Sequence, residues 1–76
     1  NDTHRRFGAL ALLVDVYQQQ QNLTLAARYL AQIQTLPFNT LTISEKARLY
    51  GLEGKLFLSL EDFDKAQKSF QLQLKI

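Results

Sequence analysis

Very few side chains in this sequence could take part in acid–base or nucleophilic chemistry. His4 is the only histidine among the 76 residues, and cysteine is absent. A catalytic base needs a nucleophile within reach and a third group that orients it. His4 has no such constellation of serine or cysteine around it. We therefore expect no enzymatic activity and no catalytic residue.

Two other patterns could bind an ion, but neither has the required spacing. Asp62 and Asp64 have no histidine or carboxylate partners recurring at metal-ligand intervals, and they suit the electropositive start of a helix. Gly51 and Gly54 are not followed by the lysine and serine or threonine of a phosphate-binding loop, and their expected role is close helix packing. We expect neither a metal nor a cofactor.

The charge balance argues against nucleic acid as a partner. The chain carries nine basic and seven acidic residues, a net charge of +2, and only Arg5 and Arg6 stand together. Phosphate binding needs basic side chains clustered on one face. The longest apolar run, residues 9–14, is far shorter than the ~20 residues of a spanning helix. A membrane-surface contact through Arg5, Arg6 and the Phe7 helix is the alternative to a solvated helix start.

The spacing of apolar residues predicts an all-α fold in a single domain. An apolar fraction of 46% and a charged fraction of 21% are typical of a globular protein. The first helix is expected over about residues 3–20. Asn22 or Thr24 caps the second helix, which ends at Leu36 because Pro37 disfavours helical geometry in the residue before it.

The second half of the chain predicts two more helices. The third begins near Ser44, with Glu45 in its first turn, and the fourth opens around Asp62. Apolar and polar residues alternate over residues 70–76, as they do in a strand with one buried face. Helix and strand therefore both fit this segment, and we expect helix.

The two halves match each other when residue i is aligned with residue i + 40. The matching pairs are Tyr17 and Phe57, Leu23 and Phe63, Ala26 and Ala66, and Leu30 and Phe70. A small alanine lets two antiparallel helices approach closely, while large apolar residues one turn away fill the space around the crossing. Each half is therefore predicted to be one helical hairpin. The first covers about residues 3–36, the connector about 37–43, and the second about 44–76.

The second half resembles the tetratricopeptide repeat family, whose signature combines a glycine and an aromatic residue on one helix with alanine and phenylalanine on the next. The matching residues are Tyr50, Gly54, Phe57, Ala66 and Phe70, and residues 62–66 are similar to the family's turn. The first half matches through Leu10, Leu13, Tyr17, Ala26, Leu30 and Pro37. Val14 replaces the usual glycine and Glu53 the usual leucine, and the offset exceeds the family period of about 34 residues.

This resemblance implies two hairpins stacked as a right-handed superhelical array, with an unrelated four-helix bundle as the alternative. It also implies that the domain binds another protein or a peptide. In such arrays the first helix of each repeat lines a concave surface. The implied contacts are Ala11, Asp15, Gln18, Gln19, Arg48, Lys55 and Ser59. The implied repeat-packing residues are Tyr17, Ala26, Leu30, Gly54, Phe57, Ala66 and Phe70.

The sequence also has more apolar residues than two hairpins can bury. The surplus residues are Leu12, Val16, Leu72, Leu74 and Ile76. Two repeats are fewer than the roughly three that normally bury a continuous core. We therefore expect these residues to be covered by a second copy, a flanking domain or the target, and a structural or self-associating segment is the alternative function. Because the chain starts at Asn1 rather than methionine, we expect it to be a piece of a longer protein.

Overall fold

The computed structural model describes residues 2–75 and contains four α-helices and one short 3₁₀ turn. Their bounds are α1 Asp2–Gln19, α2 Leu23–Gln34, η1 Phe38–Thr40, α3 Ile43–Ser59 and α4 Phe63–Leu74. No strand occurs within residues 2–75, which confirms the predicted all-α class. The strand alternative is wrong for residues 70–74, which lie in α4, while Ile76 lies outside the described residues.

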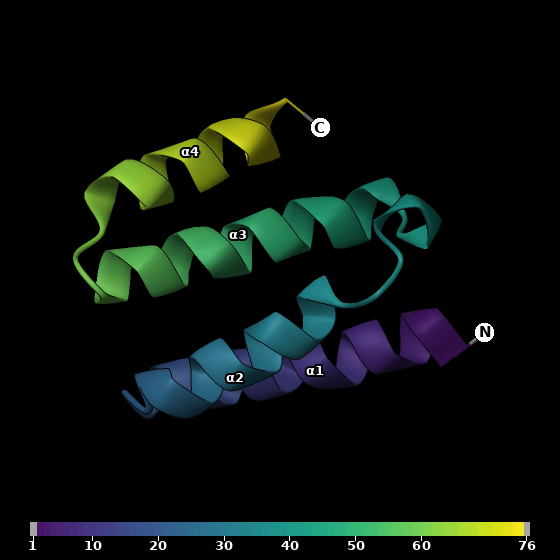
Figure 1. Ribbon diagram of the computed structural model, residues 1–76, viewed down its shortest axis with the longest axis horizontal. Coiled ribbons are helices and arrows are strands. Elements are labelled where there is room, and N and C mark those ends of the chain that lie inside the picture. The colour runs from purple at the N-terminus through teal and green to yellow at the C-terminus, as the bar shows by residue number, and fades with distance from the viewer. Residues whose placement is uncertain (1, 76) are drawn as a thin grey trace.

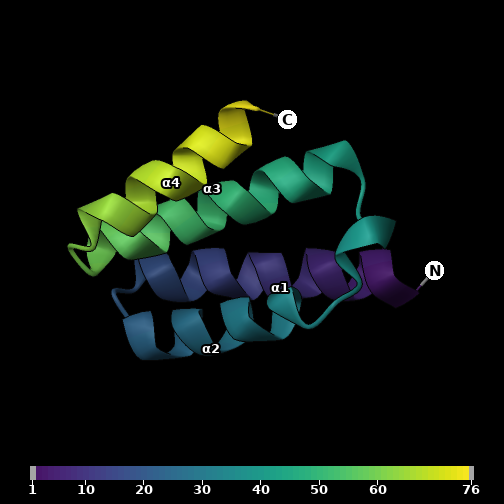
Figure 2. The ribbon, with the colours of Figure 1, turned by 45° about the horizontal axis from the view of Figure 1, so that its top comes forward.

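The helices form two antiparallel hairpins, α1 with α2 and α3 with α4. In Figure 1, α3 lies between α4 and the first hairpin. Helix α3 packs on both α1 and α2, and Figure 2 shows α1 and α3 running side by side. The resulting molecule measures 35 × 27 × 16 Å. Because the first helices of the two hairpins are neighbours, their side chains can form a shared surface.

The turns within the two hairpins have the same geometry. Gln21 and Glu61 adopt left-handed backbone conformations, with φ of 62° and 61°. The next residue, Asn22 or Asp62, donates its amide to a carbonyl five residues earlier at 2.8 Å. Its side chain accepts the amide three residues later at 3.3 Å. This combination ends one helix and caps the next, and it confirms Asn22 rather than Thr24 as the cap of α2.

The start of α3 differs from the sequence prediction. The cap is Thr42, not Ser44, and its hydroxyl accepts the Glu45 amide at 3.1 Å. The Glu45 carboxylate accepts the Thr42 amide at 2.8 Å, so the full capping box is present. The connector is also more than a spacer, because Leu41 is buried in the core and the Phe38 ring lies 6.2 Å from that of Tyr50.

The hydrophobic core lies between the first hairpin and α3. Its buried members are Phe7, Ala11, Val14, Ala26, Leu30, Ile33, Leu41, Leu49, Leu52 and Leu56. Helix α4 lies outside this cluster and buries only Ala66 and Ser69. No helix within residues 2–75 has the length and apolarity needed to cross a membrane.

Small residues allow α4 to lie close to α3. A Cβ atom on Gly54 would stand 2.5 Å from the Phe70 ring, so the ring occupies the space that a side chain would need. Near the other end of the pair, Gln73 Nε2 donates to the Ala47 carbonyl at 3.0 Å. Among the residues predicted to pack the repeats, Tyr17, Phe57 and Phe70 are half-buried. The other four, Ala26, Leu30, Gly54 and Ala66, are buried.

Candidate partner-binding surface on helices α1 and α3

An open cavity of about 260 Å³ lies where α1 and α3 run alongside each other. It is lined by Asp15, Gln18, Gln19, Gln21, Lys55 and Ser59. Five of these six side chains were predicted to contact a partner, and the structure brings those five together from two helices. Gln21 joins them from the turn that follows α1, where the chain reverses direction.

One predicted contact is wrong. Ala11 has 0% of its surface exposed and belongs to the core cluster. It lies four residues after Phe7 and three before Val14, so it shares their inward-facing stripe on α1. A partner on the surface therefore cannot reach the Ala11 side chain.

Arg48, the remaining predicted contact, is engaged within the molecule. Its Nη2 atom lies 3.3 Å from Asp15 Oδ2, forming an ion pair between α3 and α1. Both side chains are partly exposed, so the pair contributes at most about 1 kcal/mol of stability. It has a larger effect on the cavity, because Asp15 is compensated there and no longer opposes an acidic ligand.

The cavity retains polar groups that the fold leaves available. Gln18 Nε2 donates to Ser59 Oγ at 3.4 Å, while Gln18 Oε1 is buried and has no hydrogen-bond partner among residues 2–75. Lys55 is exposed and forms no ion pair with any described residue. Within this cavity, a positive charge therefore stands beside amide and hydroxyl groups.

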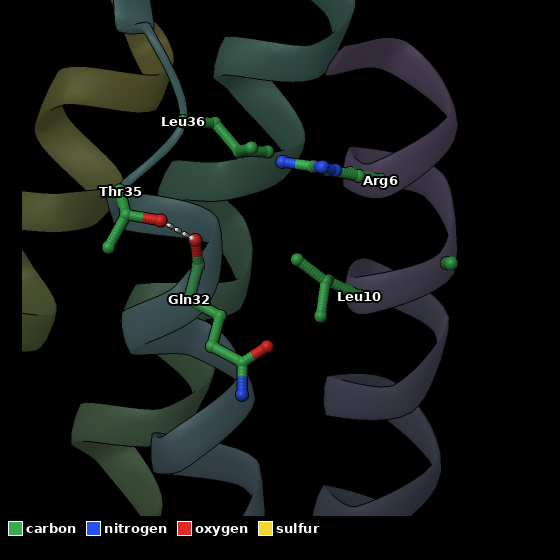
Figure 3. Close-up of a pocket in the computed structure, with 6 residues that line it drawn as sticks. Arg6, Leu10, Gln32, Thr35 and Leu36 are labelled. Carbon is green, nitrogen blue, oxygen red and sulfur yellow. Dashed lines mark hydrogen bonds between the residues drawn. The ribbon is translucent and has the colours of Figure 1, made fainter. Parts of the chain in front are cut away.

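A second, more apolar cavity of about 380 Å³ lies between α1 and α2. Figure 3 shows Arg6 extending from α1 towards Leu36, with Leu10 facing the same space. The Thr35 hydroxyl on the opposite wall donates to the Gln32 carbonyl at 2.7 Å. None of these residues was predicted to contact a protein partner, because the opening depends on how far apart the two helices lie; Arg6 was considered only for the alternative membrane-surface contact.

The lone histidine contacts a carboxylate on the other hairpin. His4 Nδ1 lies 2.8 and 3.0 Å from the two carboxylate oxygens of Glu45, which links the start of α1 to the start of α3. The Thr42 amide that donates to Glu45 lowers the pKa of this carboxyl, and His4 lowers it further. The pair therefore adds an electrostatic link between the hairpins.

Glu53 occupies a less favourable position on α3. Burial raises the pKa of its carboxyl, because removal from water penalises the charged form. Gln34 of α2 donates a hydrogen bond to Glu53 Oε1 at 3.3 Å and offsets part of this effect. Glu53 thus places a partly buried carboxyl group at the contact between the two hairpins.

Within the described part of the chain, no three histidine or acidic side chains gather in a way that could hold a metal ion. Comparisons with known proteins add no identification, since no protein-family model, curated protein or solved structure matches this chain. Any assignment of function therefore depends on the α1–α3 surface itself.

Proposed function

We propose that this domain is a protein-interaction module that binds an extended peptide segment in the cavity between α1 and α3. The observation that carries the proposal is the convergence of Gln18, Lys55 and Ser59, from two helices, on one open cavity. A volume of about 260 Å³ suits one or two peptide side chains and lies below the usual range of small-molecule pockets.

The chemistry of the cavity favours a peptide with an acidic side chain or a terminal carboxylate. Lys55 offers a cation that no described residue neutralises, whereas Asp15 is already paired with Arg48. The Gln18 and Gln19 amides can exchange hydrogen bonds with a peptide backbone. A short acidic segment would therefore bind with its charge near Lys55.

Two features support a tetratricopeptide-like arrangement as the framework of this module. Both hairpins turn through the same geometry at Gln21 and Glu61. The first helix of the second hairpin also packs on both helices of the first, as consecutive repeats do in a helical array. Under this proposal the α1–α3 surface is the concave side of the array.

Selection from a random peptide display library on the immobilised domain tests the proposal. We expect the selected peptides to carry an acidic residue and to bind Lys55→Glu at least about tenfold more weakly, a loss of about 1.4 kcal/mol. Lys68→Glu is the matched control, since it makes the same charge change at an exposed position of α4 outside the cavity. Lys55 is a sharper target than Arg48, whose reversal would also place two carboxylates together at Asp15.

Two results would contradict the peptide proposal. One is a selection that enriches no peptide over the uncoated surface. The other is a set of enriched peptides whose affinities change equally in Lys55→Glu and Lys68→Glu, which would place their binding outside the α1–α3 cavity.

Self-association is a second candidate function, favoured by apolar side chains on the surface. Leu12, Val16, Leu72 and Leu74 are all exposed, as the surplus of apolar residues in the sequence suggested. Leu12 and Val16 lie on α1 and Leu72 and Leu74 on α4, and exposed apolar surface can mark an interaction site. The domain would then serve as a structural segment of a larger assembly.

A further inference from the structure

The contact between the first hairpin and α3 uses a row of leucines whose counterparts on α1 have nothing to cover them. The buried row is Leu49, Leu52 and Leu56, which share the core cluster with residues of α1 and α2. Forty residues earlier stand Ala9, Leu12 and Val16, all exposed. Leu12 is 60% exposed and Val16 38%. Helix α1 therefore presents the kind of surface that α3 buries.

The second hairpin presents the complementary surface. Gln18 of α1 and Gln34 of α2 both contact α3, through Ser59 and Glu53. Their counterparts forty residues later are Leu58 and Leu74, which are 45% and 86% exposed. These leucines lie where a further helix would pack, if it met the second hairpin as α3 meets the first.

We propose that a second copy of this chain binds head to tail, with α1 of one copy packed on the outer face of α3 and α4 of the other. This inference rests on the second function proposed above and specifies its geometry. One chain carries both halves of the contact, and the internal contact between its own hairpins shows how such halves fit together.

In the proposed contact, most of the polar pairs of the internal interface are replaced by pairs that contain an apolar residue or glycine. Four side-chain contacts link the first hairpin to α3, namely His4 with Glu45, Asp15 with Arg48, Gln18 with Ser59, and Gln34 with Glu53. In the proposed contact they become Ser44 with Arg5, Lys55 with Gly8, Leu58 with Gln19, and Leu74 with Leu13.

None of these translated pairs brings like charges together. In the proposed contact, Leu74 and Leu13 replace the pair of Gln34 and Glu53. Burial disfavours the charged form of the Glu53 carboxyl in that pair. The proposed contact between copies is therefore more apolar at this point than the contact inside one copy. Such a contact is unlike a two-fold dimer, because each copy contributes a different surface.

Sedimentation equilibrium of the whole chain over a range of concentrations tests the inference. We expect the wild type to associate beyond a dimer, because each added copy leaves one surface of each kind free. Leu12→Glu blocks the α1 surface and Leu74→Glu blocks the α4 surface, and both residues are exposed, so the fold should survive. Each variant alone should raise the dissociation constant at least about tenfold. Ala31→Glu, on an exposed position of α2, is the control that adds the same charge.

Mixing the two variants separates head-to-tail contact from every symmetric one. Leu12→Glu retains an intact α4 surface and Leu74→Glu an intact α1 surface, so an equimolar mixture should form a dimer that grows no further. Circular dichroism spectra like that of the wild type would show that both variants are folded.

Three outcomes would overturn the inference. If the variants associate but their mixture forms no mixed dimer, the chain self-associates through another geometry, and the second proposed function survives. If the wild type is monomeric at all concentrations, the head-to-tail contact and the proposed self-association both fail. The exposed apolar surfaces would then be left for a different protein to cover. If Ala31→Glu weakens association as much as Leu12→Glu and Leu74→Glu do, the added charge alone explains the effect. Lys55 and Gln19 line the peptide cavity and also belong to the proposed contact between copies, so peptide binding is measured separately, at concentrations at which the chain is monomeric.

Discussion

Gly54 and Phe70 fill between them a space that two medium-sized residues fill in the first hairpin. Their counterparts forty residues earlier are Val14 and Leu30, both buried. In the second hairpin one side chain is absent and the other is a phenyl ring that occupies its place. Two medium-sized residues in the first hairpin thus correspond to one small and one large residue in the second. The total side-chain volume stays similar, and proteins tolerate core changes of this kind best.

The first prediction follows from this exchange. Gly54→Val should destabilise the domain by about 1–3 kcal/mol, because the new side chain must displace the Phe70 ring. Phe70→Leu alone should cost on the order of 1 kcal/mol by leaving a cavity. The double variant, which copies the Val14 and Leu30 pair, should lose less free energy of unfolding than the two single variants lose together. Urea unfolding measures all three, and strictly additive losses would contradict a shared space.

Glu53 supports a prediction about pH. Because its pKa is raised in the folded chain, its ionised form is disfavoured there relative to the unfolded chain. This penalty is absent below the ordinary pKa of 4.5, grows as the pH rises through the folded pKa, and is fully present above it. Glu53→Gln should therefore raise the melting temperature at pH 7, where the amide oxygen can still accept from Gln34, and the gain should disappear near pH 3. A gain of equal size at both pH values would show that the carboxyl's charge is not its source.

Single residues also show where sequence reasoning succeeded and failed. Helical spacing puts Ala11 on the same stripe as Phe7 and Val14, but the family resemblance implied that Ala11 contacts a partner. Helical phase is a local property that the sequence contains. The ion pair of Asp15 with Arg48 depends on how two helices lie side by side, so the sequence could not show that Arg48 is already engaged.

At the scale of elements, the turns after α1 and α3 contain the only left-handed non-glycine residues in the described chain. Such a conformation costs a residue with a side chain roughly 1–2 kcal/mol, and glycine is the usual choice at this position after a helix. Gln21 and Glu61 hold it nevertheless, because the surrounding hydrogen bonds fix the turn.

Glu61→Gly should therefore stabilise the domain by about 0.5–1 kcal/mol, after the greater flexibility of glycine in the unfolded chain is deducted. Leu60→Gly provides the contrast, because Leu60 has a φ of −86° and gains nothing from glycine. Thermal unfolding of both variants checks the expectation. A destabilised Glu61→Gly would mean that the glutamate side chain contributes more than its backbone conformation costs.

The helices were predicted closely, but the junction between the hairpins was not. Thr42 and Glu45 have the spacing of a capping box in the sequence, whereas the sequence prediction puts the start of this helix near Ser44. The burial of Leu41 could not have been read from periodicity, because a lone apolar residue in a connector belongs to no stripe. Its environment is supplied by helices that are distant in sequence.

At the scale of the whole molecule, the core is unevenly shared. Helices α1, α2 and α3 contribute to one cluster, whereas α4 buries only Ala66 and Ser69. The docking of α4 therefore removes little apolar surface from water. Local opening of a segment costs less free energy when few apolar contacts hold it. The all-α class followed from the sequence, but this division required the arrangement in space.

Hydrogen exchange should resolve the difference. Amides in the middle of α4 should exchange faster than those in the middle of α2, although both helices have 12 residues and similar side-chain caps. If the two helices exchange together, α4 opens only when the whole domain unfolds, and its contact with α3 is stronger than its buried side chains imply. The comparison should be made where the chain is monomeric, so that contact between copies adds no protection.

Helix α3 is constrained in opposite ways on its two sides. Towards the first hairpin, Leu49, Leu52 and Leu56 must be large enough to leave no void. Towards α4, a Cβ on Gly51 would stand 2.9 Å from Gln73, and one on Gly54 is already excluded by a ring. One side of this helix thus sets a minimum on side-chain volume and the other a maximum. Smaller residues should consequently be harmful at the leucine positions of α3, and larger residues should be harmful at the glycine positions between them.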